Sequence, residues 1–139
     1  MNFLYRALRK LEIESGYVLI PKSQEPFVSE QRFPATFPIM FGLIERHAVR
    51  EHQWDGKYPT RGVSTSLNIE VAKSYSKEHG VVVKISREKL REFGIKECVV
   101  NEILPADEIV KPKDEEVILV QDTDGNFPRE IIVEIIQIT

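Results

Sequence analysis

The sequence contains a single cysteine, Cys98, among its 139 residues. One thiol cannot form a disulfide within the chain, and it supplies too few ligands for a structural zinc site. No apolar run approaches the ~20 residues that a membrane-spanning helix requires. The start, MNFLYRALRKLEIESG, is interrupted by charges and lacks the apolar centre of a secretory signal. These absences predict a cytoplasmic protein without a metal or a membrane partner, and they leave secretion or injection into a host cell open.

An excess of positive charge is also absent. The formal net charge is −3, so a nucleic-acid partner is conceivable but is not indicated by charge. No glycine-rich loop of the P-loop or Rossmann kind occurs, which argues against nucleotide binding by those folds. His47 and His52 lie five residues apart, a spacing that does not place both on one helical face to bind a metal.

What remains is the composition of an ordinary globular domain, with 42% hydrophobic and 29% charged residues. The length fits one domain spanning residues 1–139. Helical spacing and capping residues predict most helices early in the chain, whereas strands dominate later, which is an α+β pattern. DTDGN (122–126) predicts a hairpin turn between the last two strands. The predicted strands are 2–8, 62–67, 81–85, 97–100, 115–121 and 130–138, and the predicted helices are 9–15, 37–50, 69–79 and 87–93.

Three polar groups interrupt these apolar strands. Arg6 lies in the middle of FLYRAL, the triplet Ser64–Ser66 occupies the second strand, and DEE (114–116) opens the strand EEVILVQ. Each has an ordinary explanation when taken alone. A strand arginine can face water, strand hydroxyls usually bond locally, and an acidic cluster before a strand is usually a solvated loop.

Taken in order, the three groups resemble a known constellation. The segments LYRALRKLEIESGYVLIPK, GVSTSLNIEVAKSY and DEEVIL are similar to the ADP-ribosyltransferases of the arginine–serine–glutamate class, the group of cholera toxin and heat-labile enterotoxin. The resemblance extends from Tyr5 to about Val133. It implies a single domain in which two antiparallel-rich sheets surround an NAD cleft, with short helices mainly in the N-terminal half.

The resemblance also implies an activity. Proteins of this class are mono-ADP-ribosyltransferases, which cleave NAD, their co-substrate, between nicotinamide and ribose. They pass ADP-ribose to a macromolecular acceptor, here expected to be a protein with an arginine side chain as the lead candidate. Glu116 matches the catalytic glutamate, which stabilises the positive charge that develops on the ribose and holds its 2′-hydroxyl. Arg6 matches the residue that contacts the NAD phosphates, because a guanidinium suits anionic oxygens.

The remaining site residues follow from the same resemblance. Ser64 matches the serine that orients the catalytic glutamate, and Thr65 and Ser66 complete the hydroxyl strand at the NAD site through local hydrogen bonds. Tyr75 has the spacing of a core aromatic residue, and it is also a candidate to contact nicotinamide. Asp114 stands where arginine-modifying members carry Glu or Gln, and its side chain reaches roughly 1.5 Å less far. It is the candidate to pair with an acceptor guanidinium.

Two other functions are consistent with the same residues. The protein could be an NAD glycohydrolase that uses water as the acceptor, or a catalytically inactive binding module with the same fold. The sequence does not name the acceptor, the oligomeric state, or a role as a toxin, an effector, a phage protein or a defence component.

Overall fold

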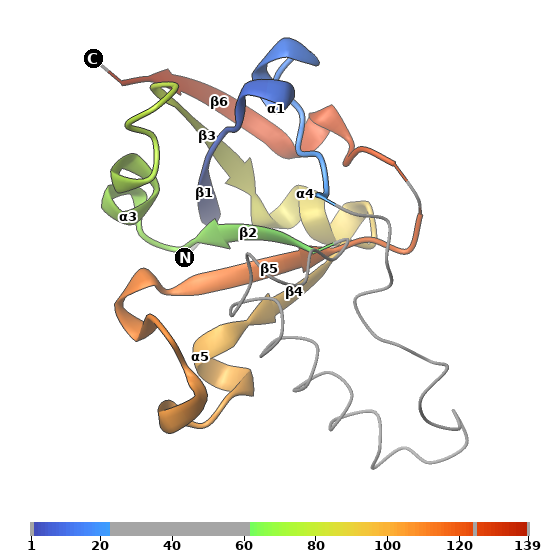
Figure 1. Cartoon of the computed structure of the whole chain (residues 1–139). Helices are drawn as coiled ribbons and strands as arrows, with labels where there is room; N and C mark the ends of the chain where they lie inside the picture. Colours follow the sequence, from blue (N-terminus) through green and yellow to red (C-terminus); the bar gives the residue numbers. More distant parts are fainter. Residues whose placement is uncertain (1, 23–61, 124, 139) are drawn as a thin grey trace.

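The computed structural model describes residues 2–22, 62–123 and 125–138 (Figure 1). Six strands in these residues form one antiparallel sheet in the order β4-β5-β2-β1-β3-β6. Short helices lie between the strands, so the predicted α+β class is confirmed. The strands are β1 (Phe3–Ala7), β2 (Val63–Ser66), β3 (Val81–Ser86), β4 (Lys96–Val99), β5 (Glu116–Val120) and β6 (Ile132–Gln137), and the helices are α1 (Lys10–Glu14), α3 (Ile69–Ser74), α4 (Arg87–Glu92) and α5 (Val100–Ile103).

The sheet is continuous, which corrects the prediction of two separate sheets. β1 and β2 are joined through a single register pair, Tyr5 with Ser66. The strands β1, β3 and β6 lie on one side of this joint, and β2, β5 and β4 lie on the other. Figure 1 shows that the strands of the two halves run in different directions. Two three-stranded halves therefore exist, but the backbone pair at Tyr5 and Ser66 makes them one sheet.

Local signals placed several elements correctly. The Asn68 side chain caps α3 by accepting from the backbone N–H of Glu70 at 2.9 Å. Ser86 caps α4 in the same way, by accepting from the N–H of Lys89 at 3.3 Å. A side-chain oxygen at this position satisfies an N–H that has no partner within the helix, which is why both residues begin helices.

Two expectations about the elements were wrong. DTDGN does not close a hairpin, because β5 pairs with β4 and β2 whereas β6 pairs with β3 at the opposite edge of the sheet. The helix expected to reach His79 ends at Ser74, and the chain then turns to Gly80 at a φ of 67°. In the described part of the chain, α3, α4 and α5 lie between residues 69 and 103. The prediction that helices lie mainly in the N-terminal half depends on residues 23–61, which lie outside the described residues. The helix expected at 37–50, with His47, and the nearby His52 lie outside the described residues.

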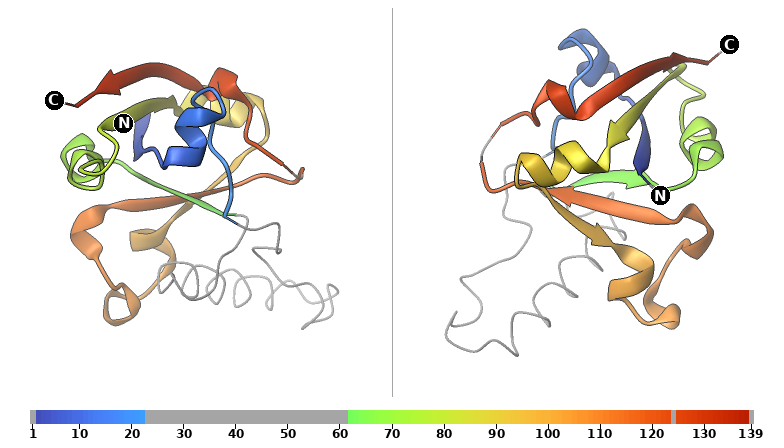
Figure 2. Two further views of the ribbon diagram at one scale, coloured as in Figure 1. Left: turned by 45° about the horizontal axis from the view of Figure 1, so that its top comes forward. Right: turned by 180° about the vertical axis from the view of Figure 1, so that it is seen from behind.

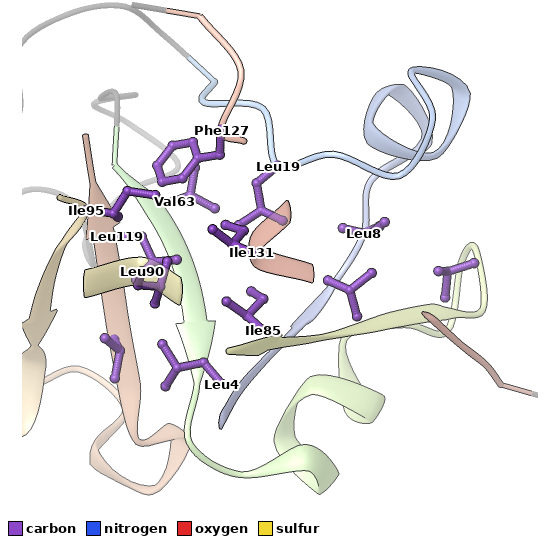
Figure 3. Packing of buried hydrophobic residues seen from close by; sticks show 13 residues of the cluster. Leu4, Leu8, Leu19, Val63, Ile85, Leu90, Ile95, Leu119, Phe127 and Ile131 are labelled. Carbon is purple, nitrogen blue, oxygen red and sulfur yellow. The ribbon is translucent and has the colours of Figure 1, made fainter. Parts of the chain in front are cut away.

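The main hydrophobic core joins both halves of the sheet. Leu4 of β1 and Ile85 of β3 pack with Leu119 of β5, and all three are fully buried (Figure 3). Leu90 from α4 and Ile131 from the 3-10 helix Arg129–Ile131 complete the same cluster. The views in Figure 2 show α4 beside this 3-10 helix at one face of the sheet. The joint between β1 and β2 is therefore held by side-chain packing as well as by its backbone pair.

None of the helices in residues 2–22, 62–123 and 125–138 has the length and apolar character that crossing a membrane requires.

Candidate active site

A cleft of about 500 Å³ lies along the joint between the two halves of the sheet. Its lining comes from β1, β2, α3, the chain after α1, and the segment 110–116. The structure brings all of the candidate site residues to this one cleft: they are Arg6, Ser64, Thr65, Ser66, Tyr75, Asp114 and Glu116.

The first contact within this set joins Ser64 to Glu116. The Ser64 hydroxyl donates to Oε2 of Glu116 at 2.6 Å, across the antiparallel pair β2–β5. Both side chains are partly buried and line the cleft. A hydrogen bond to one carboxylate oxygen restricts the orientation of the carboxylate. Ser64 therefore helps to orient Glu116 in the cleft.

The two other hydroxyls of the triplet donate to backbone carbonyl groups in and just before β5. Thr65 is buried and donates to the carbonyl of Val117 at 2.7 Å. Ser66 donates to the carbonyl of Asp114 at 2.6 Å and accepts from the N–H of Asn68 at 3.0 Å. The Thr65 bond joins β2 to β5, and the bond from Ser66 to Asp114 joins β2 to the 3-10 helix before β5. The prediction of local hydrogen bonds fits only the contact of Ser66 with Asn68, because the two carbonyl acceptors lie far from β2 in the sequence.

The third member of the trio, Arg6, is held on two sides. Its Nε donates to Oε2 of Glu12 at 3.2 Å and its Nη2 to Oε1 of the same carboxylate at 3.0 Å. Its Nη1 donates to the carbonyl of Ser64 at 2.7 Å. These bonds use one N–H on each nitrogen of the guanidinium. The side chain of Arg6 is 12% exposed, so its plane and position at the cleft are fixed by the fold.

Glu12 holds Arg6 in place, a contact that the sequence did not reveal. Its side chain is fully buried. Besides Arg6, it accepts from the backbone N–H of Arg9 at 2.9 Å and of Ile20 at 3.0 Å. The Arg9 bond is half of a capping box, because Arg9 is the N-cap of α1 and Glu12 its third residue. A helix-start glutamate was the available signal, but nothing local indicated that Arg6 and Ile20 would enclose it.

The acidic segment divides between two faces. Asp114 ends a 3-10 helix (Pro112–Asp114), and Glu115 follows in the left-handed region at a φ of 48°. This turn places Asp114 and Glu116 in the cleft, whereas Glu115 lines a separate depression with Phe3. Strand alternation also predicts that Asp114 and Glu116 share a side, but the 3-10 turn and the left-handed residue produce the arrangement here.

Tyr75 contacts the carboxylate of Asp114, and Lys111 contacts Tyr75. The hydroxyl of Tyr75 donates to Oδ2 of Asp114, and Nζ of Lys111 donates to the Tyr75 oxygen at 3.3 Å. The Lys111 ammonium also lies 5.6 Å from the centre of the Tyr75 ring, within cation–π range. Tyr75 is 56% exposed, so it is not the core aromatic that its helical spacing favoured. It is the C-cap of a helix that ends earlier than predicted.

This cluster perturbs two protonation equilibria. The hydrogen bond to Asp114, followed by partial burial, raises the pKa of Tyr75 above its ordinary value. The hydrogen bond to Tyr75 and the nearby carboxylates raise the pKa of Lys111. At neutral pH Tyr75 is therefore a neutral phenol and Lys111 a positively charged ammonium. Lys111 is the second residue that sequence reasoning missed.

No group of three or more His, Cys, Asp or Glu side chains in the described ranges 2–22, 62–123 and 125–138 is arranged to hold a metal ion.

The sequence matches no model of a known protein family. A search of curated proteins likewise finds no significant match.

Proposed function

We propose that the protein is a mono-ADP-ribosyltransferase that cleaves NAD at the bond between nicotinamide and ribose. The observation that carries the proposal is the meeting of Arg6, Ser64 and Glu116 in one cleft. They come from β1, β2 and the start of β5, so three distant parts of the sequence supply one site. The direct bond from Ser64 to Glu116 adds to this support, because it matches the role that the resemblance gives the serine.

The charges of the cleft suit this reaction. Breaking the bond transfers its electron pair to the nicotinamide nitrogen and leaves a positively charged, oxocarbenium-like ribose. A carboxylate fixed beside that carbon stabilises the charge as it develops. Glu116 is the carboxylate whose direction is set by a hydroxyl on a strand, and a rigid strand holds such a group more accurately than a loop does.

The diphosphate of NAD is negatively charged, so its binding site needs positively charged side chains. Arg6 and Arg9 line the cleft from β1 and the residues after it. The bonds of Arg6 to Glu12 and Ser64 engage one N–H per nitrogen, and a guanidinium has five N–H groups. The second N–H of Nη1 and of Nη2 is the part that we assign to a phosphate oxygen. Glu12 thereby acts as a positioning residue for Arg6.

The reaction ends when an acceptor attacks the same ribose carbon. The acceptor nucleophile forms the new bond and releases a proton, so the products are nicotinamide, the ADP-ribosylated acceptor and H⁺. Asp114 lies in the cleft two residues before Glu116, where it can pair with a guanidinium. We therefore assign a protein arginine as the lead acceptor. Water as the acceptor would make the protein an NAD glycohydrolase.

Purified protein incubated with NAD labelled in the nicotinamide ring tests the proposal. We expect nicotinamide release, with or without acceptor, to fall by a factor of ~10² or more in Glu116→Gln. Glu115→Gln is the matched control, because Glu115 lines a different depression, and it should act like the parent. A parent protein that binds NAD in calorimetry but releases no nicotinamide would instead support the inactive binding module.

A further inference from the structure

Lys111 occupies a distinctive position at the edge of the cleft. Its ammonium donates to the hydroxyl of Tyr75, and that hydroxyl donates to Asp114. The three side chains thus form a chain from the protein surface to the carboxylate. Lys111 itself is exposed, so solvent and bound molecules can reach it.

This chain interferes with the task assigned to Asp114. A guanidinium acceptor needs an anionic carboxylate with oxygens open to its N–H groups. Here one oxygen accepts from Tyr75, and the Lys111 ammonium donates to the oxygen of that phenol. An arriving cation meets a carboxylate that is already partly neutralised, whereas a neutral nucleophile such as water meets no such repulsion.

We propose that Lys111 is a specificity-determining residue that competes with cationic acceptors for Asp114. The inference rests on the proposed function and refines it. While Lys111 keeps its contact with Tyr75, transfer to water is favoured over transfer to a cationic acceptor. Transfer to a guanidinium requires the acceptor to displace the ammonium of Lys111 and to break its link through Tyr75. The chemistry of either transfer is unchanged, because each acceptor bonds the ribose carbon and loses one proton.

The alternative is that this chain only fastens the loop at 111–114 to α3. The two roles differ in what they change. A fastening role alters the rate for every acceptor together. A competing charge alters the KM for a cationic acceptor and does so less at high salt, because salt screens exposed charges.

The experiment measures the KM of a small guanidine, agmatine, and the rate of nicotinamide release without acceptor, for the parent and three variants. Lys111→Met removes the charge and keeps an unbranched side chain. Lys111→Arg keeps the charge. Lys113→Met removes a positive charge from the 3-10 helix that follows Lys111, at an exposed residue outside the cleft lining.

We expect Lys111→Met to lower the KM for agmatine by about two- to five-fold, the range of an exposed charge interaction. Transfer should rise relative to hydrolysis in the same variant, and the difference should shrink as salt is added. Lys111→Arg should restore the parent KM, and Lys113→Met should leave it unchanged.

The failures of the two proposals are distinguishable. If the parent releases nicotinamide and Lys111→Met shows the parent KM for agmatine, the inference on Lys111 is wrong while the proposed function stands. The same holds if Lys113→Met lowers the KM equally, since general surface charge would then explain the effect. If the parent releases no nicotinamide under any condition, both are wrong.

Discussion

Ser64 and Glu116 are 52 positions apart in the sequence, and the serine hydroxyl lies 2.6 Å from the glutamate carboxylate. The bond crosses two adjacent strands diagonally, since Ser64 is in register with Ile118 and Glu116 with Ser66. Because the bond lies within the sheet and not between loops, the direction of the carboxylate is built into the strand pairing.

The first prediction concerns this bond. Ser64→Ala should lower kcat for nicotinamide release by roughly 10- to 100-fold, because a hydrogen bond to a charged group contributes about 1.5–3 kcal/mol. Ser74→Ala is the control, since that hydroxyl is exposed on α3 and bonds only to the carbonyl of Val71 among the described contacts. Equal rates for Ser64→Ala and the parent would show that Glu116 does not depend on the serine.

The second prediction separates cleavage from transfer. Asp114→Ala should lose most transfer to a guanidine and retain nicotinamide release to water, because Asp114 is assigned to the acceptor and Glu116 to the ribose. The measurement is labelled nicotinamide beside ADP-ribosylated agmatine from the same reaction. Asp107→Ala, an exposed aspartate in the preceding 3-10 helix, should change neither product. Loss of hydrolysis in Asp114→Ala would place Asp114 in the cleavage step.

The third prediction concerns stability. Glu12→Gln should lower the free energy of unfolding by about 3–5 kcal/mol, because removing one partner of a buried ion pair leaves an uncompensated charge. The amide would also turn an N–H group toward donors at Arg6, Arg9 and Ile20. Denaturant unfolding followed by circular dichroism measures the change.

The matched control for Glu12 is Glu14→Gln. Glu14 is 59% exposed and pairs with Lys10 at 3.8 Å on the same helix. Such a surface pair contributes about 0–1 kcal/mol. Should the two variants unfold at the same denaturant concentration, the buried carboxylate is not holding α1 and Arg6 together.

The fourth prediction concerns pH. The phenol of Tyr75 should ionise above the ordinary tyrosine pKa of about 10, mainly because it donates to Asp114. Its pKa is raised in the folded protein, so the stabilisation it gives is complete below the unfolded pKa. That stabilisation is lost as pH rises through the folded pKa. It is small, since Tyr75 is 56% exposed.

Absorbance of the phenolate, titrated in the parent and in Tyr75→Phe, isolates this one group by difference. Asp114→Asn should lower the pKa of Tyr75 toward the ordinary value. A difference titration at or below that value in the parent would contradict the hydrogen bond from Tyr75 to Asp114.

The parts of the fold that depend on neighbouring residues could be predicted from the sequence. Asn68 and Ser86 begin helices because their side chains satisfy an N–H two or three residues ahead. The run VVVKI forms β3 because branched side chains suit a strand buried on both sides. The hydroxyl triplet was also predicted to lie on a strand, and it lies on β2.

Strand partners could not be predicted in this way. DTDGN has the residues of a tight turn, and Gly125 has a positive φ. Turn chemistry only makes the chain change direction, however. Both edges of β5 are occupied by β2 and β4, so the following strand had to pair elsewhere.

The residues of the candidate site likewise differ in how far they could be predicted from the sequence. The trio of Arg6, Ser64 and Glu116 was found because its members interrupt apolar strands in a familiar order. Glu12 and Lys111 were missed because their roles depend on partners distant in the sequence. In the sequence Glu12 is one of several charged residues in a short helix, and only the fold brings Arg6 and the backbone of Ile20 to its carboxylate. The contact of Lys111 depends on α3 ending at Ser74, which leaves Tyr75 as the C-cap that Lys111 reaches.

Because β2 pairs with β5, the candidate site is assembled late in the synthesis of the chain. Chains are made from the N-terminus, and contacts between distant residues form only after both partners exist. Arg6 and Ser64 leave the ribosome well before Glu116, so a nascent chain carries the arginine and the serine without the carboxylate. The proposed release of nicotinamide therefore requires that β5 has emerged and paired with β2, so a growing chain lacks the proposed carboxylate until that stage.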